Sequence, residues 1–341
     1  MYKDIFTLIN YLKYQNKTRR VFFFENSFIE PHLAPYVCKN KNRNQTIIVS
    51  LYKIKNDHLK NFKIFQFNKI FFLNLFFLLL KIRYCYSSTP DIDNSAFQRS
   101  IFKKTKYIYI QHSPLGLNKI YRDNAFTNFD VVQVVNNFQK NDLIDISKIK
   151  KKKIKAWRGK YLFLRNEDNN HLKFIKNNQK KKKILIAPTW GTDFFDINIH
   201  LSIKENLNPD KYDLFIRPHM MSTLKNKKLI SNLIKKDFQI SSGKIDFNCF
   251  DLLITDWSGI YIEFAKIKKI KSILIQNKEK ILNDKFIEFK NESIDLYARK
   301  KLGIILTPNE LSSVENKVND IFLNQQNYVE EINNFFKDNF Y

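Results

Sequence analysis

Short apolar segments alternate with longer amphipathic segments along the whole chain. The short ones are rich in β-branched and aromatic residues, as in buried strands, and the longer ones have helical periodicity. In the first half this pattern predicts strands at 20–24, 46–51, 63–67, 84–87, 106–111 and 130–135, and helices at 28–39, 70–80, 95–104 and after 136. In the second half it predicts strands at 183–187, 212–216, 237–241, 252–255 and 271–276, and helices at 224–235, from 260, at 310–322 and at 328–336. Such alternation indicates α/β units around parallel sheets.

Two lysine runs, 150–153 and 180–183, bracket a polar, asparagine-rich region in the middle of the chain. The α/β pattern restarts after this region. We therefore predict one domain at 1–165 and a second at 180–341, with the connection between them. Solvated linker surface is the default interpretation of the lysine runs, and a patch for membrane or polyanion is the alternative.

The most apolar stretch is IFFLNLFFLLL at 70–80, which contains Asn74 and is flanked by Lys69 and Lys81. It is too short to cross a bilayer. A buried helix is the preferred interpretation, and a helix dipping into one leaflet is the alternative. The first twenty residues show no apolar core before a small-residue cleavage site, so we expect no secretory signal.

The segment 251–265, DLLITDWSGIYIEFA, combines a buried strand, a polar turn and a helix. Ser258 is the expected N-cap of the helix, and Gly259 allows a ligand to approach the backbone. The free N–H groups and the dipole of a helix start favour an anion there. Glu263 lies at the edge of the apolar stripe, where it either accepts hydrogen bonds from ligand hydroxyls or pairs with a lysine.

Polar clusters follow four of the predicted strands. Carboxyl ends of parallel strands share one edge of a sheet, and ligands bind at that edge. Two domains facing each other across a cleft would bring the clusters together. They are HSP at 112–114, PTWG at 188–191, RPH at 217–219 and DWSG at 256–259.

Three of the side chains in these clusters suit phosphate chemistry. His112 can take a proton from an attacking hydroxyl, or it can cap the end of its strand. Arg217 and His219 can donate to phosphate oxygens, or they can lie in a salt-bridged surface loop.

The remaining clusters offer weaker candidates. Thr189 presents a hydroxyl close to the edge of the sheet. Trp190 is expected to fill the gap between the domains rather than to stack on a base. Asp256 can orient a histidine, although helix capping is the safer interpretation.

The composition bears on which kinds of molecule the protein could bind. The chain has 341 residues and a net charge of +26, with 59 Lys+Arg against 33 Asp+Glu. Abundant Lys, Asn, Ile and Phe with only 6 Gly indicate an AT-rich genome as the main source of this charge. Adsorption to an anionic membrane is the second explanation. Nucleic acid is disfavoured because no zinc-finger, helix-turn-helix or RNP-like motif is present.

Several absences limit the chemistry. There is no Walker loop and no G-x-G-x-x-G. The one D-x-D, at 91–93, lies in a loop of the first half away from the polar clusters. We therefore expect no metal and no cofactor, with a helix start, Arg and His neutralising the anion. Three cysteines without paired spacing indicate a reducing compartment.

Three motifs, ILIAPTWG at 184–191, LFIRPHM at 214–220 and the 251–265 segment, resemble the CDP-glycerol glycerophosphotransferase family in order and spacing. This family includes enzymes that make teichoic acids and capsule polymers. The stretch 109–130 is similar to its acceptor-side motif. The resemblance covers about residues 105–275. It implies a GT-B fold, with two Rossmann-like doubly wound domains facing each other across a cleft.

The resemblance also implies roles for particular residues. His112 matches the family's candidate general base, and Arg217 with His219 matches the R-P-H that engages the diphosphate. The turn of Ser258 and Gly259 matches a D-Y-S-S motif that binds phosphate, with glycine in place of the second serine. Glu263 lies where GT-B proteins often hold the nucleotide ribose. We count Thr189 and Asp256 among the donor-binding residues as well.

The expected activity is transfer of glycerol phosphate, or a similar polyol phosphate, from a CDP-linked donor to a hydroxyl of a lipid-linked or glycan acceptor. We expect the protein to be cytoplasmic and peripheral on the inner face of the cell membrane, docked through the helix 70–80 and the basic surface. One alternative is a GT-B glycosyltransferase that uses a nucleotide-sugar. Another is a catalytically silent, membrane-associated member of the family, and a third is a nucleic-acid-binding protein.

Overall fold

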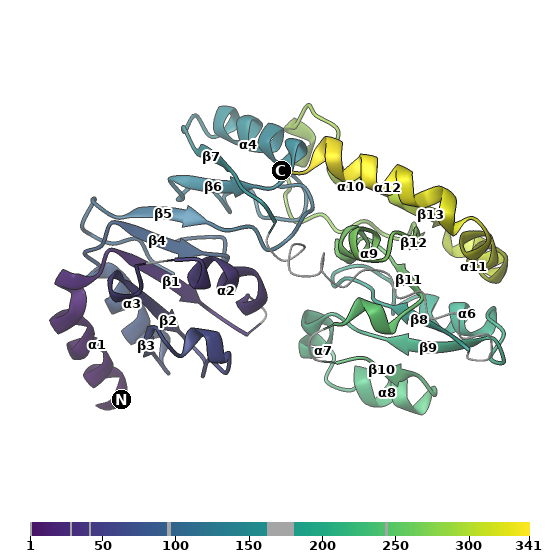
Figure 1. Ribbon diagram of the computed structural model, residues 1–341, viewed down its shortest axis with the longest axis horizontal. Coiled ribbons are helices and arrows are strands. Elements are labelled where there is room, and N and C mark those ends of the chain that lie inside the picture. Colours follow the sequence, from purple (N-terminus) through teal and green to yellow (C-terminus); the bar gives the residue numbers. More distant parts are fainter. Residues whose placement is uncertain (1, 28, 41, 94–96, 162–180, 243–244) are drawn as a thin grey trace. The chain divides into compact units, whose positions relative to one another are not determined.

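The computed structural model describes every residue except 1, 28, 41, 94–96, 162–180 and 243–244. The chain forms two compact units, each an α/β structure (Figure 1). Unit 1 contains Met1–Asn166, Leu282–Asn291 and Tyr341, and unit 2 contains Glu167–Ile281 and Glu292–Phe340. The segment predicted to connect two domains falls largely on residues outside the described part.

Unit 1 is built on a seven-stranded parallel sheet in the order β3-β2-β1-β4-β5-β6-β7. The order reverses direction between β1 and β4, as in doubly wound folds. The strands are β1 (Arg20–Phe24), β2 (Thr46–Ser50), β3 (Lys63–Gln66), β4 (Tyr84–Ser87), β5 (Lys106–Tyr109), β6 (Val131–Val134) and β7 (Lys155–Arg158). The helices described are α1 (Tyr2–Tyr14), α2 (Glu30–Cys38), α3 (Ile70–Leu78) and α4 (Asn137–Ile149).

The sequence RVFFF explains why β1 lies in the middle of this sheet. Successive side chains of a strand point to opposite faces, so Val21 and Phe23 enter one core while Phe22 and Phe24 enter another. The first core also takes side chains from α1, α3 and α4, and the second takes them from α2. Both faces are thus covered by helices, which is why the strand is apolar throughout.

Unit 2 repeats the arrangement with six parallel strands in the order β10-β9-β8-β11-β12-β13. They are β8 (Lys182–Ile186), β9 (Tyr212–Ile216), β10 (Gln239–Ile240), β11 (Leu252–Thr255), β12 (Ser272–Ile275) and β13 (Gly303–Leu306). The helices described are α6 (Ile199–Glu205), α7 (Met220–Lys225), α8 (Leu229–Lys235), α9 (Ile260–Lys268), α10 (Ile294–Leu302), α11 (Val314–Leu323) and α12 (Gln325–Asn339).

The apolar run 70–80 is largely core. It forms α3, in which Leu73, Phe76 and Phe77 are fully buried while Ile70 and Phe71 are exposed. No helix in the described parts of the chain is long and apolar enough to cross a membrane.

The helix expected at 95–104 is wrong for 97–104, which form turns and irregular backbone, while 95–96 lie outside the described residues. Local side-chain bonds replace the helical ones: the Ser100 hydroxyl donates to the carbonyl of Leu80 at 2.6 Å and accepts from the Phe102 N–H at 3.0 Å. Phe97 is fully buried in the first core. Serine competes in this way with helical hydrogen bonding.

The helix expected at 224–235 is interrupted. It divides into α7 and α8, because Asn226 ends α7 and its side chain accepts from the N–H of Lys228 at 3.1 Å. This is an Asx-type turn, which asparagine favours over a continuing helix.

Candidate functional site

The carboxyl edge of unit 2 gathers the polar clusters that follow β8, β9 and β11. These strands are neighbours in one parallel sheet, so their carboxyl ends lie side by side. Thr189 and Trp190 follow β8, Arg217 and His219 follow β9, and Asp256 follows β11. The fold thus brings together these candidates from three separate parts of the sequence.

Asp256 joins two of these loops. Its carboxylate accepts the backbone N–H of Thr189 and the hydroxyl of Thr192, both at 2.7 Å. The residue is fully buried, and burial raises the pKa of its carboxyl while these hydrogen bonds act in the opposite direction. Arg299 donates to the backbone carbonyl of Asp256 at 2.6 Å. The expectation that Asp256 caps a helix is therefore replaced by a bridging role between loops.

The imidazole of His219 is neutral, and its Nε2–H can donate a hydrogen bond. Its Nδ1 accepts the N–H of Met221 at 3.1 Å, at the start of α7. Burial, with smaller effects from Lys280 and Arg217, lowers the pKa of His219 to about 4. A neutral imidazole whose Nδ1 accepts carries its hydrogen on Nε2. His219 is therefore suited to donating a hydrogen bond to an anionic oxygen rather than to removing a proton.

Two lysines complete a cationic group around Trp190. The Nζ of Lys280 lies 4.1 Å from the centre of an indole ring of Trp190, and that of Lys225 lies 5.1 Å away. The centre of the His219 ring lies 6.2 Å from the ring centre of Trp190. We call Trp190, Arg217, His219, Lys225 and Lys280 the Trp190 cluster.

Burial changes the charges in this cluster. Burial lowers the pKa of Lys280 to about 8, with Asp256 raising it and Lys225 lowering it further. Burial also lowers the pKa of Arg217, and its buried Nη1 has no hydrogen-bond partner among the described residues. A cationic cluster that includes a buried guanidinium nitrogen with no hydrogen-bond partner among the described residues fits a site for an anion.

Lys225 and Lys280 were not among the site residues predicted from the sequence. Lys280 follows β12, the next strand of the sheet after β11, in the segment Asn277–Lys280. That position after a strand was the available signal, although the same holds for many of the chain's lysines.

The helix start at α9 lies at the same edge. Its N-cap is Gly259 rather than Ser258, whose hydroxyl is 3.5 Å from the N–H of Ile260. The expected N-cap was thus wrong by one residue. Ser258 and Gly259 are half-buried, and Glu263 lies in the first turn, also half-buried.

In unit 1, His112 lies at the carboxyl edge of the sheet, three residues after β5. Its Nδ1 is 2.7 Å from the hydroxyl of Tyr109, and its backbone carbonyl accepts from Tyr161 at 3.1 Å. A second histidine, His32 on α2, lies with its ring centre 6.2 Å from that of His112. Burial, with a smaller effect of His112, lowers the pKa of His32 to about 3. His32 was not among the site residues predicted from the sequence.

Solved structures with the same architecture bind nucleotides. The chain is similar to a UDP-GlcNAc 2-epimerase from Neisseria meningitidis bound to UDP-GlcNAc, with a TM-score of 0.60 and 12% identity over 92% of this chain and 94% of that one. It is also similar to MnaA of S. aureus with UDP, with a TM-score of 0.57 and 11% identity over 92% and 90%. Two doubly wound units, each with a polar carboxyl edge, place the protein in the class of GT-B-like α/β folds, as the sequence predicted.

A family profile matches the middle of the chain. Residues 158–279 are similar to the profile of the CDP-Glycerol:Poly(glycerophosphate) glycerophosphotransferase family. The match confirms the resemblance and supports a transferase. A comparison with curated protein sequences gives no match. The matched residues include Thr189, Arg217, His219 and Asp256, whereas His112 and Lys280 lie outside them.

Proposed function

We propose that the protein transfers glycerol phosphate, or a similar polyol phosphate, from a CDP-linked donor to a hydroxyl of a lipid-linked or glycan acceptor. The Trp190 cluster is the observation that carries this proposal. It offers cationic groups and a neutral imidazole donor at the carboxyl edge of a Rossmann-type sheet, inside or next to the segment that matches the family. Such a group suits a diphosphate.

The chemistry follows from the roles of the residues. An acceptor hydroxyl attacks the β-phosphorus of the donor, forming a new P–O bond, while the bond from that phosphorus to the bridging oxygen breaks and CMP leaves. His112 takes the proton of the acceptor hydroxyl. Arg217, Lys280 and the Nε2–H of His219 hold the charge that develops on the leaving phosphate, together with the turn at 258–259. Thr189 and Asp256 shape the donor-binding loop, and Glu263 faces the donor ribose.

The test is release of CMP by the purified protein. It is incubated with CDP-glycerol, CDP-ribitol and a panel of nucleotide-sugars, with a membrane-lipid extract as acceptor. We expect CMP from a CDP-polyol, and a loss of 100-fold or more in His112→Ala and in His219→Ala. His58→Ala is the matched control because His58 is exposed on a short 3₁₀ helix of unit 1, outside the carboxyl-edge loops.

Other outcomes would redirect the proposal. Turnover with a nucleotide-sugar, without a new phosphodiester in the product, would make the protein a GT-B glycosyltransferase. The nucleotide-sugar ligands of the similar structures favour this second candidate. Absence of both turnover and nucleotide binding would indicate a catalytically silent member of the family.

We also propose that unit 1 docks on the anionic inner face of the cell membrane. Helix α1 is apolar on two sides, because Leu8 and Tyr11 pack inward while a second stripe faces solvent. Helix α3 contacts α1 and adds further exposed apolar side chains. The resulting α1–α3 apolar face consists of Tyr2, Ile5, Phe6, Ile9, Leu12, Ile70, Phe71 and Leu78.

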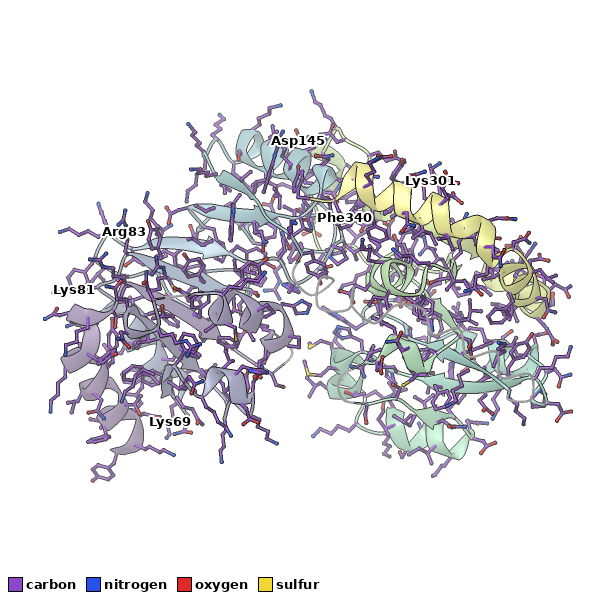
Figure 2. All side chains as sticks on the ribbon, viewed as in Figure 1. Lys69, Lys81, Arg83, Asp145, Lys301 and Phe340 are labelled. Atoms are coloured by element: carbon purple, nitrogen blue, oxygen red, sulfur yellow. The ribbon has the colours of Figure 1, made fainter. Side chains whose placement is uncertain are left out.

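Basic residues border this face. Figure 2 shows Lys69, Lys81 and Arg83 on the side of unit 1 that carries α1, and Lys3 and Lys13 are exposed on α1 itself. An apolar stripe with basic edges is complementary to an anionic lipid surface, where the apolar side chains enter the headgroup boundary.

Sedimentation with vesicles tests the docking. We expect the protein to bind vesicles that contain phosphatidylglycerol, and Phe6→Glu with Phe71→Glu to weaken binding tenfold or more. Leu323→Glu is the control, since Leu323 is 83% exposed on α11 of unit 2. Equal binding by all variants, or none by the wild type, would contradict the docking. Dimer dissociation by the same variants without vesicle binding would assign the face to a second copy instead.

A further inference from the structure

The tyrosine that precedes His112 by three residues contacts the imidazole directly. Tyr109 is the last residue of β5 and is fully buried, with its ring packed edge-on against Phe126 and Phe129. The short contact of its hydroxyl with Nδ1, at 2.7 Å, fixes the plane and the position of the His112 ring. The hydrogen bond from Tyr161 fixes the backbone of the same residue.

The hydroxyl proton of Tyr109 decides where the hydrogen of the imidazole lies. Tyr109 donates to the hydroxyl oxygen of Tyr121 at 3.4 Å. A hydroxyl has only one proton, and Tyr109 uses it toward Tyr121. In its other hydrogen bond the Tyr109 oxygen is therefore the acceptor, and Nδ1–H of His112 is the donor. A neutral imidazole with its hydrogen on Nδ1 carries a lone pair on Nε2. That is the form required to take a proton.

We propose that Tyr109 is the positioning residue that holds His112 in its base-competent tautomer. The inference rests on the proposed role of His112 as the proton acceptor. When Nε2 takes the proton of the acceptor hydroxyl, the Nδ1–H bond to Tyr109 stays in place, so no rearrangement accompanies the step. A buried hydroxyl thus does for His112 what a carboxylate does in other histidine bases.

The burial of Tyr109 supports this arrangement. Burial, with the nearby Tyr121, raises the pKa of the Tyr109 hydroxyl well above its usual value. The hydroxyl therefore remains neutral across the physiological range and keeps both its donor and its acceptor. It orients the imidazole without adding a negative charge near the reacting hydroxyl.

The test compares Tyr109→Phe with the wild type by ¹⁵N NMR of the histidine rings, using the whole protein. In the wild type we expect the His112 signals of the Nδ1–H tautomer. In Tyr109→Phe we expect a mixture of both tautomers. Tyr107→Phe is the matched control, because Tyr107 lies on the same strand with 1% exposure and its hydroxyl accepts from Ser100 rather than from His112.

Kinetics give the second readout. We expect Tyr109→Phe to lower kcat by 10- to 100-fold while KM for the donor stays unchanged. Identical His112 tautomers in the two proteins would overturn the inference, as would an unchanged kcat. If no donor is turned over, the proposed function fails, and the NMR comparison still decides the role of Tyr109.

Discussion

Individual side chains in unit 2 have acid–base properties that differ from those of the many exposed lysines. Lys280 is half-buried against Trp190 and near Lys225, so its ammonium is less stable than that of a lysine in water. With a pKa of about 8, it is mostly charged at pH 7, about half charged at pH 8 and mostly neutral at pH 9. The charge of the proposed donor site therefore depends on pH in a range where phosphates do not titrate.

Binding of CDP is expected to weaken as pH rises from 7 to 9. Deprotonation of Lys280 removes a charge-assisted hydrogen bond to the anion, whereas bound anion favours the protonated form, so binding takes up protons. We expect Lys280→Met to weaken CDP binding about 10- to 100-fold at pH 7 and to flatten the pH dependence, as one charged hydrogen bond contributes about 1.5–3 kcal/mol. Lys280→Arg should keep affinity at pH 9, since guanidinium remains charged. Isothermal titration calorimetry at pH 7, 8 and 9 measures this, and an equal slope in Lys280→Met would contradict the assignment.

At the scale of elements, a single carboxylate fixes α1 to the start of α3. Asp4 is fully buried, and its oxygens accept the backbone N–H of Asn68 at 3.0 Å and that of Lys69 at 3.1 Å. The Asn68 side chain donates to it at 2.9 Å. These groups lie at the N-terminus of α3, where a helix favours negative charge. The α1–α3 apolar face is held in place from its inner side.

Removing this carboxylate should destabilise unit 1. Asp4→Ala removes the charged acceptor of three hydrogen bonds from Asn68 and Lys69, and we expect a loss of roughly 2–3 kcal/mol of unfolding free energy. Urea denaturation measures it. Asp57→Ala is the control, because Asp57 is exposed and pairs with Lys60 on the surface, so no measurable change is expected. Equal stability of Asp4→Ala and the wild type would show that α1 is not held by this contact.

The sequence predicted best the strands that are buried on both faces, because burial requires apolar residues along their whole length. Strands such as β1, β8 and β11 were predicted because both faces are apolar. β7 was missed because its sequence KAWR is mostly exposed at the edge of the sheet, so burial does not select its residues. The helix predicted at 95–104 was wrong for 97–104, a segment that contains Ser100, whose hydroxyl donates to the carbonyl of Leu80, a residue twenty positions earlier in the chain.

At the scale of the whole molecule, the two units repeat one strand order, and this follows from the alternating pattern of the sequence. The candidate site could be predicted from the sequence only in part. Arg217 and His219 come directly after a strand, in a recognisable motif. Lys225 and Lys280 are two among 59 basic residues, and only the path of the chain shows that both reach Trp190.

Residues 282–291 belong to unit 1, although unit 2 continues on both sides of them. Leu282 and Asn283 donate backbone hydrogen bonds to the carbonyl of Lys119, and the Asn283 side chain donates to that of Asn118. Unit 1 is therefore incomplete until most of unit 2 has been synthesised. During translation, unit 1 cannot complete its fold until residues 282–291 have been made, more than a hundred residues after the first segment of the unit. The two units are therefore expected to finish folding together rather than one after the other. For the same reason, recombination at a single point between the units would not yield an intact N-terminal half.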